Sequence, residues 1–146
     1  MSIYIHEENS KFHVKQKRQL KKWLQELILL HVKIPGAVNI ILRTDEELLE
    51  MNQSVLNHDT YTDIITFNYN LGNTIHGDLF ISIDRVKENA IKFAVPTDVE
   101  LRRVMAHGVL HLIGFNDKKE EEQTQMRIEE NKALQIYDQM FHVKHE

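Results

Sequence analysis

The sequence predicts an α+β fold, in which a single domain over residues 1–146 packs about five helices on a mixed sheet of about four strands. The chain has 146 residues, of which 42% are hydrophobic, and this length can bury about two thirds of the unfolded surface in one core. Four short runs are rich in β-branched residues, and longer segments between them have the periodicity of amphipathic helices. No internal repeat, low-complexity stretch or linker interrupts this pattern.

The first strand and helix are marked by their apolar residues. Residues 3–5 form a short β-branched run, and residues 11–31 then have the apolar spacing of one helix. Because an apolar residue recurs every three or four positions, one face of this helix should pack on the sheet. The residues expected on that face are Leu20, Trp23, Leu24, Leu27 and Leu30.

A second strand and a short helix are expected next. Pro35 and Gly36 should end the connection, and residues 38–42 form a β-branched run. Thr44 and Glu47 have the spacing of a capping box, in which each side chain bonds the backbone N–H of the other residue. They predict a helix that continues to about residue 53.

The centre of the chain predicts two strands and a third helix. Residues 62–69 and 77–83 are the clearest strands, and residues 70–73 between them are typical of a turn. Asp84 is a candidate cap for the next helix, which must stop before Pro96. The residues expected to face inward on it are Val86, Ala90, Ile91 and Ala94.

Two more helices complete the predicted fold. Thr97 and Glu100 have the spacing of a second capping box, which predicts the start of the fourth helix. The face of this helix that should be ordinary core comprises Leu101, Met105, Gly108 and Leu112. The last helix should turn inward Met126, Leu134 and Tyr137.

The most informative motif, HGVLHLIGFND, lies on the fourth helix and just after it. His107 and His111 are four residues apart, so their imidazoles share one helix face. Gly114 falls where a helix end favours a left-handed glycine, and the returning chain can bring Asp117 to the same point. Zinc accepts two imidazoles and a carboxylate, and three protein ligands leave a fourth position for water. The motif predicts one zinc ion per chain, with metal-bound water as the reacting group.

The same spacing resembles the extended zincin signature, in which a glutamate after the first histidine acts as the general base of a peptidase. Here that position is Gly108, so a peptidase would have its ligands without its base. A glycine inside a helix costs about 1 kcal/mol of helix propensity relative to alanine. Its presence therefore indicates that another element or a ligand approaches the backbone closely.

Composition and charge narrow the classes of function. The chain has no cysteine, which excludes disulfides and thiolate ligands. It begins without a signal-peptide pattern and has no run of the roughly 20 apolar residues that span a membrane, so we expect a cytoplasmic protein without a membrane partner. The net charge of −4 argues against a general nucleic-acid coat.

Residues 11–33 are an exception to the acidic composition. They contain seven lysines and arginines against one glutamate, which gives a local net charge of +6. Lys17, Arg18 and Lys21 are candidates for binding the RNA backbone, although a solvated helix face is the commoner explanation of such a stripe.

These motifs together resemble the YbeY family of bacterial endoribonucleases that mature ribosomal RNA, whose hallmark is HGxLHLxGYDH. Residues 62–67 are similar to the family's TDVLSF strand, and Met126 and Glu130 fit its closing helix. The hallmark is matched by His107, Gly108, Leu110, His111, Leu112 and Gly114, with Phe115 in place of tyrosine. The GDIxIS strand of the family is matched by Gly77, Asp78, Ile81 and Ser82. The resemblance spans roughly residues 40 to 130.

Two positions depart from the family pattern. Asp117 aligns with the family's third metal-binding histidine, which leaves metal identity and affinity open. An arginine implicated in the family's activity aligns with Leu56, and neither Asn57 nor His58 nearby supplies a permanent positive charge. If that arginine stabilises transition-state charge in relatives, this chain needs another cation, for which Arg103 is a candidate.

The resemblance implies a zinc-dependent hydrolase that cuts single-stranded RNA. It would act in ribosomal RNA maturation, including processing of the 16S 3′ end, and in ribosome quality control. Its partners would be ribosomal RNA and the small ribosomal subunit, and its oligomeric state is left open. Two alternatives remain: a metal-stabilised ribosome assembly factor without activity, and a minimal zinc metallopeptidase.

The remaining histidines have no spacing that assembles a site, and we expect them on the surface or in packing contacts. His58 is the exception to watch, because the loop that carries it could fold over the cleft. The full set is His6, His13, His31, His58, His76, His142 and His145.

Overall fold

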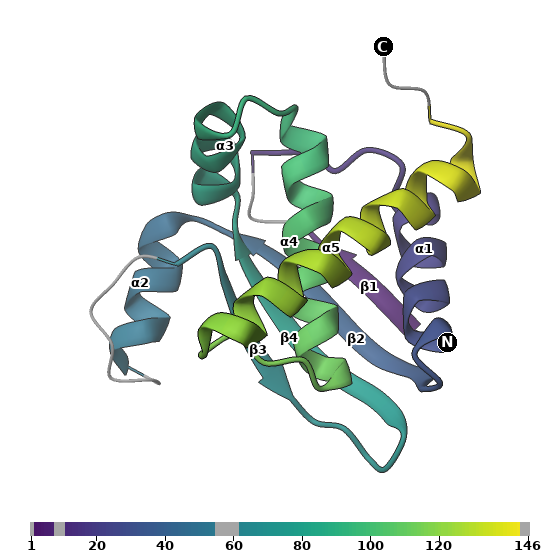
Figure 1. Ribbon diagram of the computed structural model, residues 1–146. Helices are drawn as coiled ribbons and strands as arrows, with labels where there is room; N and C mark the ends of the chain where they lie inside the picture. The colour runs from purple at the N-terminus through teal and green to yellow at the C-terminus, as the bar shows by residue number, and fades with distance from the viewer. Residues whose placement is uncertain (1, 8–10, 55–61, 144–146) are drawn as a thin grey trace.

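The computed structural model describes residues 2–7, 11–54 and 62–143, and its elements are shown in Figure 1. The strands are β1 (Ser2–His6), β2 (Ile34–Arg43), β3 (Ile64–Asn68) and β4 (Thr74–Ser82). The helices are α1 (Lys17–Leu30), α2 (Asp45–Ser54), α3 (Ile83–Lys92), α4 (Thr97–Ile113) and α5 (Glu120–Phe141). Over the described residues, none of these helices is both long and apolar enough to span a membrane.

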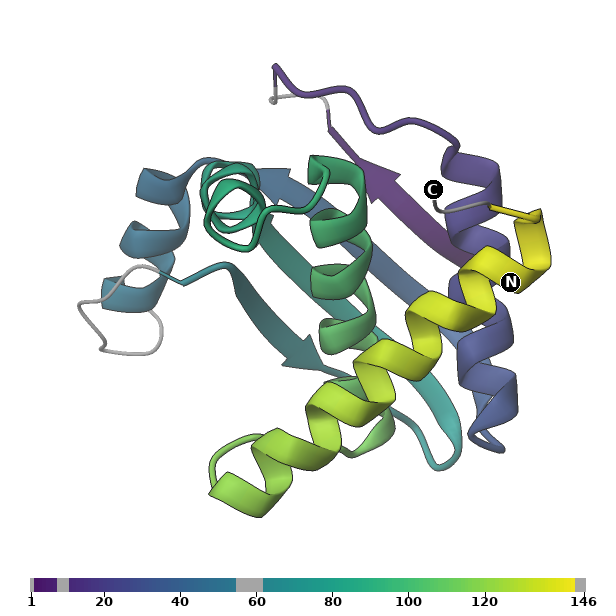
Figure 2. The ribbon, with the colours of Figure 1, turned by 45° about the horizontal axis from the view of Figure 1, so that its top comes forward.

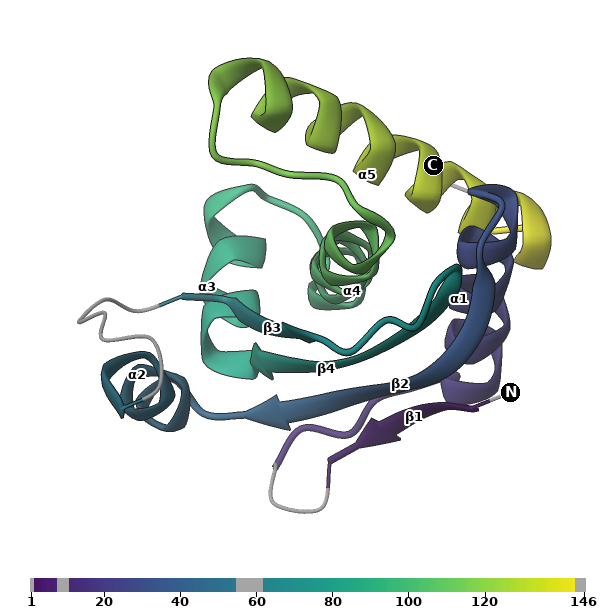
Figure 3. The ribbon, with the colours of Figure 1, turned by 90° about the horizontal axis from the view of Figure 1, so that it is seen from below.

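The four strands form one mixed sheet in the order β1-β2-β4-β3. β1, β2 and β4 are parallel neighbours, and β3 pairs antiparallel with β4. α4 lies on the sheet between α1 and α3, and α5 crosses over α4 on its outer side (Figures 2 and 3). The predicted fold class, a four-stranded mixed sheet packed with five helices, is confirmed.

The hydrophobic core joins the sheet to α1, α4 and α5. Trp23 of α1 is fully buried, and its indole N–H donates to the carbonyl of Ala133 on α5 at 2.8 Å. The Trp23 ring also meets the edge of Tyr137 at a centroid distance of 5.4 Å. An indole buried with its N–H satisfied anchors two elements at once. This contact holds α5 in the position from which its first half reaches the end of α4.

The first helix begins at Lys17, so the predicted start at residue 11 is wrong. The Glu7 carboxylate accepts the backbone N–H of Val14 at 2.6 Å and pairs with the Lys17 ammonium, which holds residues 11–16 in an irregular path. Gln16 then has a left-handed backbone with φ of 59°. The local apolar pattern carries no sign of this distant carboxylate.

The inward face of α1 is largely as predicted. Leu20, Trp23, Leu24 and Leu27 are buried, as expected. Leu30 is 55% exposed, and Ile28 is the residue that is fully buried near the helix end. The prediction for Leu30 is wrong because the stripe continues at the four-residue step from Leu24 to Ile28.

β2 begins at Ile34, four residues before the predicted start. Pro35 and Gly36 belong to the strand rather than to a connection, and the register with β4 shifts between Pro35 and Val38. A bulge of this kind accommodates a proline that cannot donate to the ladder. The prediction for these two residues is therefore wrong.

The capping box of α2 is confirmed. The Glu47 carboxylate accepts the Thr44 backbone N–H at 3.2 Å, and the Thr44 hydroxyl accepts the Glu47 backbone N–H at 3.2 Å. α2 contacts α3, β3 and β4.

The cap of α3 is Ser82 rather than Asp84. The Ser82 hydroxyl accepts the backbone N–H of Arg85 at 3.2 Å. Asp84 lies in the first turn instead, and its carboxylate accepts the backbone N–H of Asp45 at 2.8 Å. Both residue types cap helices, so the choice depended on where β4 ends.

The end of α3 also differs from the prediction. Val86 and Ala90 are buried as expected, but Ile91 is 82% exposed. Ala94 is exposed and lies beyond the helix, with a left-handed backbone at φ of 54°. Ile91 directly follows buried Ala90 on α3 and therefore points about 100° away from it around the helix, whereas Ala94 lies beyond the end of α3 at Lys92.

The last two helices each carry one wrong assignment. Pro96 rather than Thr97 precedes α4, and no side chain caps it, so the predicted capping box of Thr97 and Glu100 is absent. Glu100 is instead buried. On α5, Met126 and Tyr137 are buried as predicted, whereas Leu134 is half-buried and its neighbour Ala133 faces the core.

Candidate metal centre

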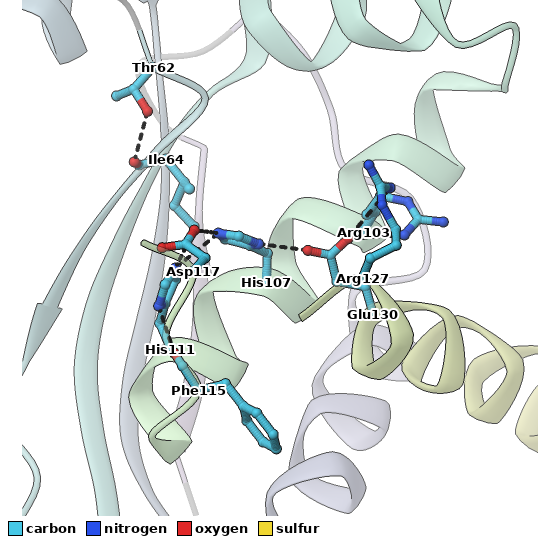
Figure 4. A network of polar contacts seen from close by, with 9 residues as sticks. All are labelled: Thr62, Ile64, Arg103, His107, His111, Phe115, Asp117, Arg127 and Glu130. Atoms are coloured by element: carbon cyan, nitrogen blue, oxygen red, sulfur yellow. Dashed lines mark hydrogen bonds and ion pairs between the residues drawn. The ribbon is translucent and has the colours of Figure 1, made fainter. Parts of the chain in front are cut away.

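The three predicted ligands come together at the C-terminal half of α4 (Figure 4). The Nε2 atoms of His107 and His111 lie 3.0 Å apart, and each lies 3.2 Å from Oδ2 of Asp117. Ligand atoms bonded to a tetrahedral zinc at 2.0–2.1 Å are separated by about 3.3 Å. The triangle therefore fits one ion. Within the described ranges, these residues form the one group of three side chains that could hold a metal.

Hydrogen bonds on the far side of each imidazole fix which nitrogen faces the centre. Nδ1–H of His107 donates to Oε2 of Glu130 at 2.6 Å, and Nδ1–H of His111 donates to the carbonyl of Phe115 at 2.9 Å. Both neutral tautomers then leave the Nε2 lone pair directed at the centre. Two lone pairs and a carboxylate oxygen thus meet at close range, an arrangement that a metal ion or a shared proton makes favourable.

The end of α4 explains how Asp117 reaches its position. Gly114 has a φ of 130°, and the N–H of Phe115 bonds back to the carbonyl of Leu110 at 3.0 Å. This closes the helix in the manner that favours glycine. The chain then turns back toward the histidines, so the predicted role of Gly114 is confirmed. The same turn aims the Phe115 carbonyl at His111 and delivers Asp117.

Gly108 marks a close approach between α4 and the sheet, as predicted. A Cβ atom at this position would lie 2.6 Å from Cδ1 of Ile64 and 2.9 Å from Cδ1 of Leu79. The glycine therefore allows α4 to pack directly on β3 and β4. A side chain at the position of the zincin base would begin against the sheet.

Glu130 links the metal centre to two arginines. Its carboxylate is buried. It lies 3.0 Å from Nη1 of Arg103 and 3.7 Å from Nη1 of Arg127. Burial would raise the pKa of Glu130, but the bonds to His107 and Arg103 outweigh it and hold the pKa below the ordinary value. Burial would likewise lower the pKa of His107, yet the Glu130 bond and the surrounding carboxylates raise it. Glu130 therefore faces His107 as a carboxylate.

A cleft of about 240 Å³ opens beside the centre and has His107 in its wall. α3, α4 and α5 line it, together with Asp63, which precedes β3. Burial raises the pKa of Asp63, and the nearby charge of His107 offsets only part of this effect. Burial also raises the pKa of Glu100, against the opposing charge of Arg103. The cleft thus contains two carboxyl groups with raised pKa values, Asp63 and Glu100, in addition to His107.

The predicted substitute cation, Arg103, lies in the wall of this cleft but is already engaged. Its Nη1 donates to Glu130 at 3.0 Å and its Nη2 donates to Oδ1 of Asn131 at 2.9 Å. Leu56, Asn57 and His58 lie outside the described residues.

The basic stripe of α1 is separate from the metal centre. Lys17, Arg18 and Lys21 line a surface hollow of about 500 Å³ that shares no residue with the cleft. The Lys17 ammonium is paired with Glu7. α1 and α3 lie on opposite sides of α4 (Figures 1 and 2), so the stripe and the α3 wall of the cleft are on different flanks.

The other histidines within the described ranges take no part in the triad. His6 and His76 hydrogen-bond to Asn39 and to the backbone N–H of Ala37, respectively, and His31 lies 3.8 Å from the Glu129 carboxylate. His58 and His145 lie outside the described residues. These contacts agree with the packing or surface roles that the sequence indicated.

The contribution of Glu130 was missed in the sequence analysis, although a signal was present. Met126, Ala133 and Tyr137 are buried at helical spacing on α5, and Glu130 falls on the same face. Glu129 is buried beside it, and carboxylates on a buried helix face indicate partners, because an unpaired buried charge is costly. The partners of Glu130 are His107 and Arg103, whereas Glu129 accepts from Gln125.

Two kinds of comparison, by sequence and by fold, relate this chain to known proteins. A sequence model described as Endoribonuclease YbeY matches residues 4–138. Endoribonuclease YbeY of Flavobacterium psychrophilum is 47% identical over 133 residues, which cover 91% of this chain and 92% of the relative. The protein of the same name from Phocaeicola vulgatus is 46% identical over 83% of this chain and 88% of its own.

A solved structure extends the comparison to the fold. The solution structure of TM1509 from Thermotoga maritima superposes with a TM-score of 0.67 at 25% identity, and the match covers 97% of this chain and 92% of that one. The two named relatives are more than 40% identical to this chain over most of both chains. The solved structure shows that the fold agrees as well. On sequence and fold alike, this chain belongs to the Endoribonuclease YbeY family.

Proposed function

We propose that this chain is a metal-dependent endoribonuclease that cuts single-stranded RNA, and that His107, His111 and Asp117 hold one zinc ion. The observation that carries the proposal is the convergence of two Nε2 atoms and Oδ2 within 3.2 Å of one another. Membership of a family of endoribonucleases supports RNA as the substrate. It does not favour a peptidase or an inactive assembly factor.

Several of the chain's own groups would prepare the site for the ion and the substrate. Glu130 and the Phe115 carbonyl hold the two imidazoles in the ligating tautomer. Asp117 has a side chain that is 37% exposed, so one side of the centre is open to substrate. When bound, a divalent ion supplies Lewis acidity, which lowers the pKa of water or polarises a phosphoryl oxygen. Arg103 would act by positioning Glu130, since both of its terminal nitrogens are engaged.

We further propose ribosomal RNA as the substrate and the small ribosomal subunit as the partner. The activity would serve maturation of the 16S 3′ end and ribosome quality control in the cytoplasm, with residues 1–146 acting as one domain. These assignments rest on the family resemblance. The basic residues of α1, of which Arg18 and Lys21 lie beside the surface hollow, would contact the RNA backbone away from the centre.

The contribution of α1 can be measured separately from catalysis. Changing Lys17, Arg18 and Lys21 to glutamine should weaken RNA binding and reduce the slope of log affinity against log salt by about 0.7 for each lost phosphate contact. Because Lys17 is paired with Glu7, we expect most of the effect from Arg18 and Lys21. An unchanged affinity and salt slope would remove α1 from the RNA interface.

The proposed activity is tested with purified protein stripped of metal. Zinc should restore cleavage of a short single-stranded RNA by the wild type, and His111→Ala should remain inactive at every zinc concentration. Asp117→His is the matched variant, because it restores the third histidine of the family pattern and should keep activity. Cleavage by stripped His111→Ala would show that the nuclease is a contaminant or that this centre is not used.

A second candidate function is tested because the family resemblance aligns Leu56 with an arginine implicated in activity. If the chain were a metal-stabilised assembly factor, chelation would lower its melting temperature while zinc-loaded protein never cut RNA. Cleavage that depends on zinc would exclude this alternative.

A further inference from the structure

We propose that Phe93 and Asn89 form a subsite for one unpaired nucleobase, at the end of the cleft away from the metal ligands. The inference rests on the proposed ribonuclease function and assigns the residues that hold the strand beside the cleavage point. It explains how the chain would select single-stranded RNA through a pocket rather than through charge alone.

Phe93 presents an aromatic ring to the cleft. It is the residue directly after α3, it lines the same cleft as His107, and it is 51% exposed. Because about half of Phe93 is exposed at the cleft wall, a flat ring stacked on it would remove apolar surface from water. The ammonium of Lys92 lies over the Phe93 ring, 5.6 Å from the ring centroid, and adds a positive charge there. Nucleobases stack on aromatic side chains in this way.

Asn89 supplies a polar edge next to the ring. It is four residues before Phe93, so both side chains lie on the same flank of α3, and both line the cleft. Asn89 is half-buried, and no hydrogen bond to its side-chain amide is found among the residues that the structure describes. An amide offers a donor and an acceptor together, which matches the edge of a base.

The charges of the cleft favour a neutral ring over a phosphate. Asp63, Glu100 and Glu130 line it, against the two guanidinium groups of Arg103 and Arg127. Arg103 lies 3.0 Å and Arg127 lies 3.7 Å from the Glu130 carboxylate, which offsets part of both positive charges. The negative charge of a phosphate placed here would be repelled by the excess of carboxylates, whereas a neutral base would not be repelled. The base, and not the backbone, therefore enters this part of the cleft.

The size and position of the cleft agree with a single base. Its volume of about 240 Å³ is below the range of about 300–1,000 Å³ that is typical of sites for whole drug-sized ligands. Glu100 and His107 both line the cleft. They are seven residues apart on α4, a separation of about 10 Å along the helix axis. A base at the α3 end would thus belong to a nucleotide close to the one at the metal. A base paired in a duplex cannot enter such a pocket.

The test compares kinetics of zinc-loaded variants on a short single-stranded RNA. Phe93→Ala should raise KM about 5- to 150-fold, which is the loss expected when one base–aromatic stack is removed. kcat, zinc affinity and melting temperature should change little. Phe93→Tyr should restore KM, whereas Phe93→Leu should not. Ile91→Ala is the matched control, because Ile91 is 82% exposed near the same end of α3 but does not line the cleft.

A scan with abasic substrates locates the base. One abasic position should raise KM for the wild type by the same factor as Phe93→Ala, and it should cause no further loss in Phe93→Ala. Asn89→Ala should change the preference among the four bases at that position. If the wild type cuts RNA and Phe93→Ala matches Ile91→Ala, or if no abasic position couples to Phe93, the subsite is wrong while the ribonuclease stands. If zinc-loaded wild type cuts no RNA, the proposed function fails and the subsite falls with it.

Discussion

Removal of the Glu130 carboxylate should weaken zinc binding without any change in the three ligands. Glu130 accepts the Nδ1–H of His107 at 2.6 Å, which fixes the tautomer that presents Nε2. Its negative charge also offsets Arg103 and Arg127, which lie 3.0 and 3.7 Å away. Without the carboxylate, the imidazole loses its orienting partner and two guanidinium groups stand uncompensated behind a cationic centre.

The magnitude follows from these two losses. A hydrogen bond to a charged group contributes about 1.5–3 kcal/mol net, and loss of an outer partner of a metal ligand costs about 10- to 100-fold in affinity. We expect Glu130→Ala to lie at the upper part of this range, because both the bond and the charge are lost. Glu130→Gln keeps an acceptor oxygen and should lose about tenfold, since the bond is no longer charge-assisted.

The assay is a zinc titration of stripped protein against a chelating competitor, with thermal melting in parallel. Glu129→Ala is the matched control: Glu129 is the adjacent residue and is 8% exposed against 6% for Glu130. Its carboxylate accepts from Gln125 and lies near His31 and Lys132, with no contact to His107. If Glu130→Ala binds zinc as tightly as Glu129→Ala, the positioning role of Glu130 is refuted.

Three further predictions concern the turn, the pH response and the cleft. Gly114→Ala forces a side chain onto a φ of 130°, so we expect a loss of about 1–2 kcal/mol in the free energy of unfolding, measured by denaturant titration. Zinc must displace any proton from His107, whose pKa is lowered by burial but raised more by Glu130. Zinc affinity should therefore be constant above that raised pKa and fall about tenfold per pH unit below it. Calorimetry of zinc binding at several pH values checks this, and an affinity that does not change with pH would contradict it. Burial raises the folded-state pKa of Glu100 above its unfolded value, so its ionisation costs stability at neutral pH and this cost disappears as pH falls below the unfolded value. Glu100→Gln should therefore raise the melting temperature at pH 7 and leave it little changed at low pH, whereas a lower melting temperature at pH 7 would show that ionised Glu100 is stabilising.

The metal triad could be predicted from sequence because its geometry is local. His107 and His111 share a helix face by their spacing, and Gly114 indicates the turn that brings Asp117 back to these histidines. The same holds for the capping box of Thr44 and Glu47, which depends on residues three apart. Periodic and short-range patterns are sufficient for such features.

The errors and omissions arose where distant residues decide the outcome. α1 begins late because Glu7 binds Val14 and Lys17. The carboxylate that orients His107 comes from Glu130, 23 residues further along the chain and on another helix. No local pattern assigns such a partner, although the position of Glu130 on an apolar face was a clue.

The most direct test of the central claim follows zinc occupancy and RNA cleavage in the same sample. Stripped protein is titrated with zinc, and the bound metal and the rate of cleavage of single-stranded RNA are measured at each point. If His107, His111 and Asp117 hold the ion on which cleavage depends, the rate should rise in proportion to occupancy and stop rising at one zinc per chain, and His111→Ala should show neither. A rate that is independent of occupancy, or cleavage by His111→Ala, would contradict the account.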